Sequence, residues 1–358
     1  MLPAMMRRLI LVLAALALTA CAPMIQSLEH PGLGFQGPRL EADDVVSFDG
    51  AKLGLKTWVP QDREPWAVVV GAHGMNDYSN AFHLAGPYWA SQGIATYAYD
   101  QRGFGRSRER GVWAGEKTLT EDLRTVAALV RRRYPHAVIA IAGESMGAAV
   151  AIEAFASDRP PAASRLILVS PAVWGWSSQP IPNKTALWLT AHVAGGTVIT
   201  PPRFITRHIL PTDNIPELIA MGKDPLQEWG ARTDALYGLV SLMQHAWRDT
   251  GRLPVATLYL QGAHDQIIPR APHLQAAARL KPADRSAYYA HGYHLLLVDH
   301  QAPVVWGDIQ SFIADPAAPL PSGAPVIPGA PTLTNTPTTS AQAASITAFT
   351  TPASASTP

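Results

Sequence analysis

The sequence predicts an α/β fold with a mostly parallel central sheet flanked by helices. Two observations carry this prediction. Between residues 43 and 314, short apolar segments alternate with segments whose apolar residues recur three and four positions apart, the patterns of strands and helices respectively. The strand segments are also apolar almost without interruption, which is typical of parallel strands that are covered on both faces.

The predicted elements follow one another in a regular order. A hairpin is expected at 45–50 and 52–60, and further strands at 66–74, 94–103, 137–143, 165–173, 255–265 and 285–292. Helices are expected at 83–93, 119–135, 147–156, 273–280 and 304–315. Residues 176–253 contain helix-like patches but no clear strand, so we expect an inserted segment there.

The first twenty residues have the organisation of a secretory signal. Arg7 and Arg8 precede an apolar run from Leu9 to Leu18, and small residues lead up to Cys21. As a helix the run would measure roughly 15 Å, too short for the ~30 Å hydrocarbon core of a bilayer. The ending LTAC resembles the lipobox of bacterial lipoproteins, which implies that Cys21, the single cysteine, carries a lipid. A simple signal peptide that is cleaved elsewhere is the alternative.

The lipobox leads to an expectation about the location of the protein, and the composition of the two ends leads to expectations about the segments that flank the domain. The lipobox implies a membrane-anchored bacterial lipoprotein facing the periplasm. Because Ala22 is not the aspartate associated with inner-membrane retention, we expect the outer membrane. Residues 21–42 are predicted to be a linker between the anchor and the domain. Residues 315–358, rich in Pro, Ala, Ser and Thr, are predicted to be a disordered tail.

Charge and motifs exclude several classes of partner. The 28 Lys and Arg residues nearly balance the 27 Asp and Glu residues, so no basic field favours nucleic acid. The histidines are scattered, and HExxH, a cysteine cluster and a Gly-rich phosphate loop are all missing from the sequence. We therefore expect no nucleic-acid partner, no metal and no organic cofactor.

A GxSxG motif, GESMG at 143–147, lies between a predicted strand and a predicted helix. A reactive serine at such a turn is held out at the edge of the sheet. The backbone there is packed so closely that side chains two residues before and after the serine would clash. Gly143 and Gly147 meet this requirement, so Ser145 is the candidate nucleophile; the alternative is a serine that merely caps a helix.

At this point the chain resembles the α/β-hydrolase family, and within it the lysophospholipase and monoacylglycerol lipase-like branch, over roughly residues 43–314. The segments that carry the resemblance are HGMNDYSN, YAYDQRGFGRS, GESMGAAVA, LQGAHDQIIP and HGYHLLL. The resemblance implies an α/β-hydrolase fold, a triad in the order serine, acid, histidine, and a helical cap, which the insert at 176–253 would form.

The other triad members are predicted from their positions. A serine hydroxyl needs a base to take its proton, and the base needs a carboxylate to orient it. Asp265 and His294 each follow a predicted strand and match the family motifs, so we assign them as acid and base. His291 for the base, and the strand-end residues Asp77, Asp100 and Asp299 for the acid, are the rivals.

The remaining site residues come from the resemblance. It implies an oxyanion hole formed by the backbone amides of Met75 and Met146, with His73 and Gly74 shaping the first turn. Asp100 and Arg102, in DQRGFGRS, are expected to hold loops rather than to perform chemistry.

The expected activity is cleavage of carboxylic esters of lipids, monoacylglycerols or lysophospholipids, by a serine hydrolase. Trp188, Leu189 and other apolar residues of the insert suit an acyl-chain tunnel, although such residues are often plain packing. The alternatives are a carboxylesterase acting on small soluble esters, a peptidase of related fold, and a catalytically silent binding lipoprotein.

Overall fold

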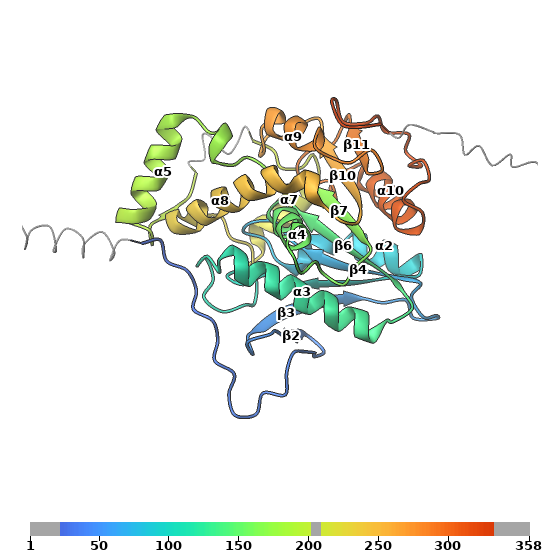
Figure 1. Ribbon diagram of the computed structural model, residues 1–358, viewed down its shortest axis with the longest axis horizontal. Coiled ribbons are helices and arrows are strands. Elements are labelled where there is room, and N and C mark those ends of the chain that lie inside the picture. The colour runs from blue at the N-terminus through green and yellow to red at the C-terminus, as the bar shows by residue number, and fades with distance from the viewer. Residues whose placement is uncertain (1–21, 202–208, 333–358) are drawn as a thin grey trace, which may run out of the picture.

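The computed structural model describes residues 22–201 and 209–332 and has a nine-stranded sheet between two layers of helices (Figure 1). The strand order is β1-β2-β3-β5-β4-β6-β7-β10-β11. Neighbouring strands from β5 through β11 are parallel, whereas β1, β2 and β3 pair antiparallel. The predicted α/β class with a mostly parallel sheet is confirmed.

The element bounds are as follows. The strands are β1 (Arg39–Leu40), β2 (Asp44–Val46), β3 (Lys52–Trp58), β4 (Ala67–Ala72), β5 (Ile94–Tyr99), β6 (Val138–Glu144), β7 (Arg165–Val169), β8 (Val198–Ile199), β9 (Ala231–Arg232), β10 (Ala256–Gly262) and β11 (Arg285–Tyr289). The helices are α2 (Ala85–Ser91), α3 (Glu116–Arg133), α4 (Met146–Ala156), α5 (Ile181–Val193), α7 (Ile215–Lys223), α8 (Thr233–Asp249), α9 (Arg270–Ala277) and α10 (Ala302–Ala314), with 3-10 turns at Ser79–Phe82, Trp176–Ser178 and Thr250–Arg252.

Helices cover both faces of the sheet, which explains why its central strands are apolar on both sides. Helices α3, α4, α8 and α9 pack on one face, and α2 and α10 pack on the other. All six residues of β4 are buried, with Val68 and Val70 facing the first layer and Val69 facing the second. The alternation follows from the two-residue period of a strand.

The insert lies between β7 and β10, as predicted, but its boundary needs correction. Helix α8 was expected to belong to the insert, yet its buried residues Leu242, Met243 and Ala246 join the main core and the helix packs against α4. The cap is therefore the segment from Trp176 to Arg232, with α5, α7 and the short β8–β9 pair. In Figure 1, α5 stands at the outer edge of the molecule against α8.

The expected linker is also corrected, because much of residues 22–42 is tied to the domain. The amide of Gln26 donates to the carbonyl of Trp113 at 2.9 Å, and that of Glu29 donates to Asp49 at 2.9 Å. Arg39–Leu40 forms β1. From Gln26 onward, these contacts hold much of the segment against the domain.

The predicted tail begins too early. Residues 315–332 lie against the domain, where Ser322 donates to Asp308 and Ile327 is 1% exposed. Composition averaged over the segment hides these few specific contacts. The predicted signal peptide at 1–20, Cys21 and the tail residues 333–358 lie outside the described residues.

Candidate active site

Ser145 occupies a strained turn between β6 and α4. Its φ of 51° lies in the left-handed region that non-glycine residues rarely adopt. The turn is fixed by its backbone, since the Ser145 amide donates to Val169 at 2.9 Å and its carbonyl accepts from Ala172 at 3.0 Å. Because Ser145 is partly exposed while Met146 is fully buried, the strained turn presents the hydroxyl at the surface of the core.

The two flanking glycines are required by close packing. A Cβ atom on Gly143 would lie 2.5 Å from the backbone nitrogen of Ala148, and one on Gly147 would overlap the carbonyl of Ala72 at the end of β4. Neither obstacle is a flexible side chain, so any larger residue would force the backbone apart. The prediction that these glycines permit a tight strand–helix turn is confirmed.

The turn after β4 lies directly against the nucleophile. A Cβ atom on Gly74 would be 3.3 Å from the Cβ of Ser145. The turn closes through a 3.4 Å hydrogen bond from the amide of Asp77 to the Gly74 carbonyl, with Asn76 at a φ of 66°. Asparagine tolerates this left-handed conformation. Met75 thus sits on a tight turn beside Ser145.

Met146 is the first residue of α4, so its amide has no partner within the helix. An unpaired amide at this end of a helix suits a developing negative charge. The oxyanion role of Met75 and Met146 stays a prediction.

His73 holds the same turn in place through two hydrogen bonds. Its Nε2 accepts a hydrogen bond from the Gln101 amide at 2.9 Å, and its Nδ1 lies 2.7 Å from the Gly74 carbonyl. This arrangement requires the proton on Nδ1. Burial lowers the pKa of His73 to about 4, so the ring stays neutral at pH 7. His73 is therefore a structural residue of the turn and not a catalytic base.

Asp265 and His294 are in direct contact. The Nδ1 of His294 donates to Oδ2 of Asp265 at 2.8 Å, which leaves Nε2 free to accept a proton. The side chains are only 2% and 5% exposed, respectively. Burial alone would raise the pKa of Asp265, but the charge of His294 and the hydrogen bonds from His273 and His294 hold it well below its usual range. Asp265 is therefore ionised.

Three of the alternative candidates for the base and the acid, His291, Asp299 and Asp100, lie in other environments. His291 is exposed, whereas His294 is buried. Asp299 accepts from the Tyr293 amide at 2.7 Å and so shapes the loop that carries His294. Asp100 accepts from the amides of Ser79 and Arg106, both at 2.8 Å. These contacts make Asp299 and Asp100 structural residues.

Arg102 also holds loops, as expected. Its guanidinium pairs with Asp49 at 2.6 Å and with Asp122 at 2.7 Å, and all three side chains are buried. The group joins the loop after β5 to α3 and to the turn before β3.

Sequence reasoning missed His273. This residue of α9 is fully buried, with Nε2 3.3 Å from Oδ2 of Asp265 and Nδ1 2.8 Å from the hydroxyl of Tyr259. Because a carboxylate only accepts, Nε2 carries the proton and Nδ1 accepts from the tyrosine. Asp265 is thus held by two imidazoles. The only signal in the sequence was a histidine eight residues after the acid, on an otherwise unremarkable helix.

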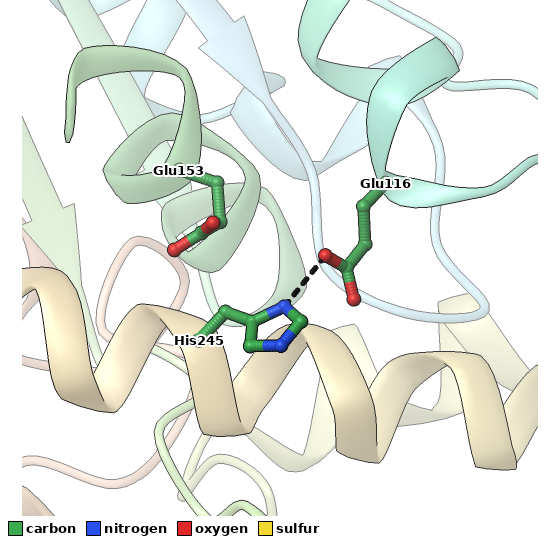
Figure 2. A group of neighbouring side chains, drawn as sticks. All are labelled: Glu116, Glu153 and His245. Atoms are coloured by element: carbon green, nitrogen blue, oxygen red, sulfur yellow. Dashed lines mark hydrogen bonds and ion pairs between the residues drawn. The ribbon is translucent and has the colours of Figure 1, made fainter. Parts of the chain in front are cut away.

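One further cluster has the residue types of a metal site. Among the described residues, Glu116 of α3, Glu153 of α4 and His245 of α8 offer ligand atoms within 4.8 Å of one another (Figure 2). His245 Nδ1 lies 2.8 Å from Glu116, so these two satisfy each other. Burial, followed by repulsion from Asp249, raises the pKa of Glu153 to about 7. We assign no metal to this contact between helices.

The strained serine turn, the buried Asp265–His294 pair and the order of the strands define a serine hydrolase with the α/β-hydrolase fold. The comparisons agree with this class. Residues 63–301 match the family described as serine aminopeptidase, S33, and the chain belongs to that family.

The chain is also similar to individual enzymes. A monoacylglycerol lipase of Mycolicibacterium smegmatis is 25% identical over 279 residues, 74% of this chain and 93% of the relative. A monoglyceride lipase of Rattus norvegicus is 28% identical over 137 residues, which span 38% of this chain and 45% of the relative.

Solved structures share the fold. A soluble variant of the monoglyceride lipase from Saccharomyces cerevisiae has a TM-score of 0.64 at 18% identity, covering 82% of this chain and all of that one. A carboxyl esterase from Bacillus coagulans has a TM-score of 0.62 at 19% identity, covering 79% of this chain and all of that one.

Proposed function

We propose that the protein cleaves carboxylic esters of lipids, monoacylglycerols or lysophospholipids, through an acyl-enzyme on Ser145. The observation that carries this proposal is the Asp265–His294 pair at the same sheet edge as a serine on a strained turn. The monoacylglycerol lipase of M. smegmatis, alignable over most of its length, supports a lipid ester as the substrate.

The residues perform the reaction in two halves. His294 Nε2 takes the hydroxyl proton as Ser145 Oγ attacks the ester carbonyl, and the amides of Met75 and Met146 stabilise the oxyanion. The ester C–O bond then breaks, and the proton passes from His294 to the leaving alcohol. In the second half, a water molecule attacks the acyl carbonyl and loses its proton to His294. The bond to Ser145 Oγ then breaks, the fatty acid leaves, and His294 returns the proton to Ser145 Oγ.

The cap supports binding of an apolar chain. A groove of about 460 Å³ lies between α5 and α8; three aromatic side chains, Trp176, Trp188 and Tyr237, line it together with Lys184 and Thr185. Several apolar residues of α5 face outward, among them Leu189 at 52% and Val193 at 70% exposure. We assign the groove to the acyl chain of the substrate.

The location is also a proposal. Lipidation of Cys21 would hold the enzyme on the periplasmic face of a bacterial membrane, where lipid esters are abundant; the outer membrane is our choice because Ala22 follows the cysteine. Within the described residues, no helix has the length and apolar character needed to cross a bilayer.

The catalytic proposal is tested by three variants on p-nitrophenyl butyrate and monooleoylglycerol. Ser145→Ala and Asp265→Asn should each lower kcat by about 10⁴, because each removes a member of the triad. Asp299→Asn should retain most activity, since Asp299 contacts the backbone rather than His294. Undiminished turnover by Ser145→Ala, or the opposite order for the two aspartates, contradicts the assignment.

A further inference from the structure

An acidic cavity borders the candidate active site. It has a volume of about 240 Å³, lies beneath α7, and is lined by residues next to the catalytic groups in the chain. Glu144 directly precedes Ser145, Leu295 directly follows His294, and Asp77 ends the turn that carries Met75. The spatial link runs through the turn after β4, because the amide of Asp77 donates to the Gly74 carbonyl and Gly74 lies directly against Ser145.

Four carboxyl groups line this cavity: Asp77, Glu144, Glu217 and Asp224. Glu144 is 2% exposed, and its Oε1 has no hydrogen-bond partner. Asp77 is 8% exposed and accepts only from the amide of Tyr78, at 2.7 Å. These two buried carboxyls have no positive partner on this wall of the cavity, and ionising them there is costly unless a cation binds.

The protein supplies little positive charge here. No Lys or Arg lines the cavity in the part of the chain that the structure describes. His83 lies 3.1 Å from Glu217, and the nearby Lys56 donates to Asn80 at 2.6 Å rather than to a carboxylate. The hydroxyl of Tyr78 donates to Asp224 at 2.5 Å. None of these contacts reaches Glu144.

The carboxyls also repel one another. Burial, and then repulsion by Asp224 and Asp100, raises the pKa of Asp77 to about 7. Burial, and then the charges of Asp77 and Asp299, raises the pKa of Glu144 well above its usual value. A positive group within the cavity would relieve both the repulsion and the lack of a partner.

We propose that this cavity binds a positively charged alcohol portion of the ester substrate, an ammonium group of the size of choline. The cavity volume of about 240 Å³ leaves room for a small organic cation. This inference rests on the proposed ester hydrolysis at Ser145. It adds a preference to that activity: among the esters that the enzyme cleaves, those whose alcohol carries a cation are hydrolysed faster than those with an uncharged alcohol such as glycerol.

The test compares two esters of the same shape. Octanoylcholine carries a quaternary nitrogen where 3,3-dimethylbutyl octanoate carries a carbon. The wild-type enzyme should prefer the choline ester by about tenfold or more in kcat/KM, because a buried charge contact is worth at least this factor. Glu217→Gln and Asp224→Asn should each bring the ratio of the two values toward one.

A matched control separates local charge from net charge. Glu64→Gln removes the same charge from an exposed side chain that does not line the cavity, and it should leave the ratio at the wild-type value. Equal rates on both esters in the wild type, or an equal change in the Glu64 variant, would overturn the inference while leaving ester hydrolysis intact.

A binding measurement does not depend on turnover. Choline titrated into Ser145→Ala should bind by calorimetry, and adding Glu217→Gln and Asp224→Asn should abolish the binding. Loss of all hydrolysis, including that of p-nitrophenyl butyrate, would reject the proposed function, yet choline binding would still support the cavity assignment. Binding of Ca²⁺ but not choline to the same residues would overturn it.

Discussion

His273 shows how a residue far from the reacting atoms can control them. It donates to the same carboxylate oxygen of Asp265 that His294 uses, at 3.3 Å, and is itself held by Tyr259. Because the charge of Asp265 is shared between two donors, His273 is a positioning residue that sets both the orientation and the charge available to His294.

Replacing His273 with Phe should lower kcat by roughly tenfold with little change in KM, since orientation is lost but substrate contacts remain. The acid limb of the pH profile of kcat/KM should also move to higher pH, because protonated His294 then faces an unshared carboxylate. Steady-state rates on p-nitrophenyl butyrate from pH 5 to 9 measure both effects. A loss of activity without movement of the acid limb would mean that His273 only fills space.

Asp77 should make stability depend on pH. Its pKa rises from about 3.9 in the unfolded chain to about 7 in the folded protein, first because of burial. The folded state therefore holds a proton that the unfolded chain has lost, and stability falls as pH rises from about 4 to 7.

Asp77→Asn should remove this cost. The difference between the two pKa values corresponds to roughly 4 kcal/mol. At roughly 2–4 °C per kcal/mol, the Tm of the variant should exceed that of the wild type by on the order of 10 °C at pH 8, and the gap should shrink toward pH 4. Calorimetry at both pH values, with the exposed Asp62→Asn as control, measures the gap. A constant gap across this range would show that Asp77 does not titrate as described.

At the scale of residues, the sequence predicted the catalytic groups that lie within short, recognisable motifs. Ser145 was recognisable from its two glycines, and Asp265 and His294 from their places after strands. His273 and Glu144 were not recognised, because their importance depends on neighbours far away in the chain: Tyr259 for the first, and the cavity beneath α7 for the second.

Among the elements, α8 and the end of the chain show where sequence patterns misled. Helix α8 directly follows the cap elements in the chain, and its packing on α4 shows that it belongs to the core. The segment after α10 has a composition typical of disorder, but three contacts hold it. The amide of Ser322 donates to Asp308, the amide of Tyr288 donates to the Pro325 carbonyl at 2.8 Å, and Ile327 is buried.

This segment covers the exposed edge of the sheet. Strand β11 is the last in the order, and edge strands with free backbone groups favour aggregation. A chain ending after residue 332 should keep the wild-type Tm, whereas one ending after Asp315 should unfold several degrees lower and aggregate on heating. Differential scanning calorimetry with light scattering compares the two. Equal behaviour would show that the contacts of residues 316–332 contribute nothing to stability.

The cap groove should set the preference for chain length. Trp188 lines the groove and stacks on His192, with ring centroids 4.3 Å apart. Trp188→Ala should lower kcat/KM about tenfold for a decanoate ester, which needs the apolar wall, and much less for an acetate ester. The two p-nitrophenyl esters report this directly. Equal losses on both would mark Trp188 as a packing residue.

For the whole molecule, the start of the described chain lies beside the cap. The sulfur of Met24 is 3.6 Å from the guanidinium of Arg232 in β9, and Gln26 is bonded to the loop of Trp113. Cys21 is only three residues before Met24, at most about 11 Å of extended chain. A lipid on Cys21 would therefore bring the apolar, outward-facing residues of α5 close to the membrane surface.

The last prediction concerns this anchor. Cys21 should carry two or three acyl chains, because a single chain binds membranes only marginally at ~0.8 kcal/mol per buried methylene. Mass spectrometry of the mature amino terminus should find a lipidated Cys21, and Cys21→Ser should move the protein from the membrane fraction to the soluble fraction. The same variant should hydrolyse soluble p-nitrophenyl esters at the wild-type rate but lipid esters in vesicles more slowly, since the anchor holds the cap at the bilayer. An unmodified start at another residue, or unchanged fractionation of Cys21→Ser, would rule out the anchor without affecting the catalytic assignment.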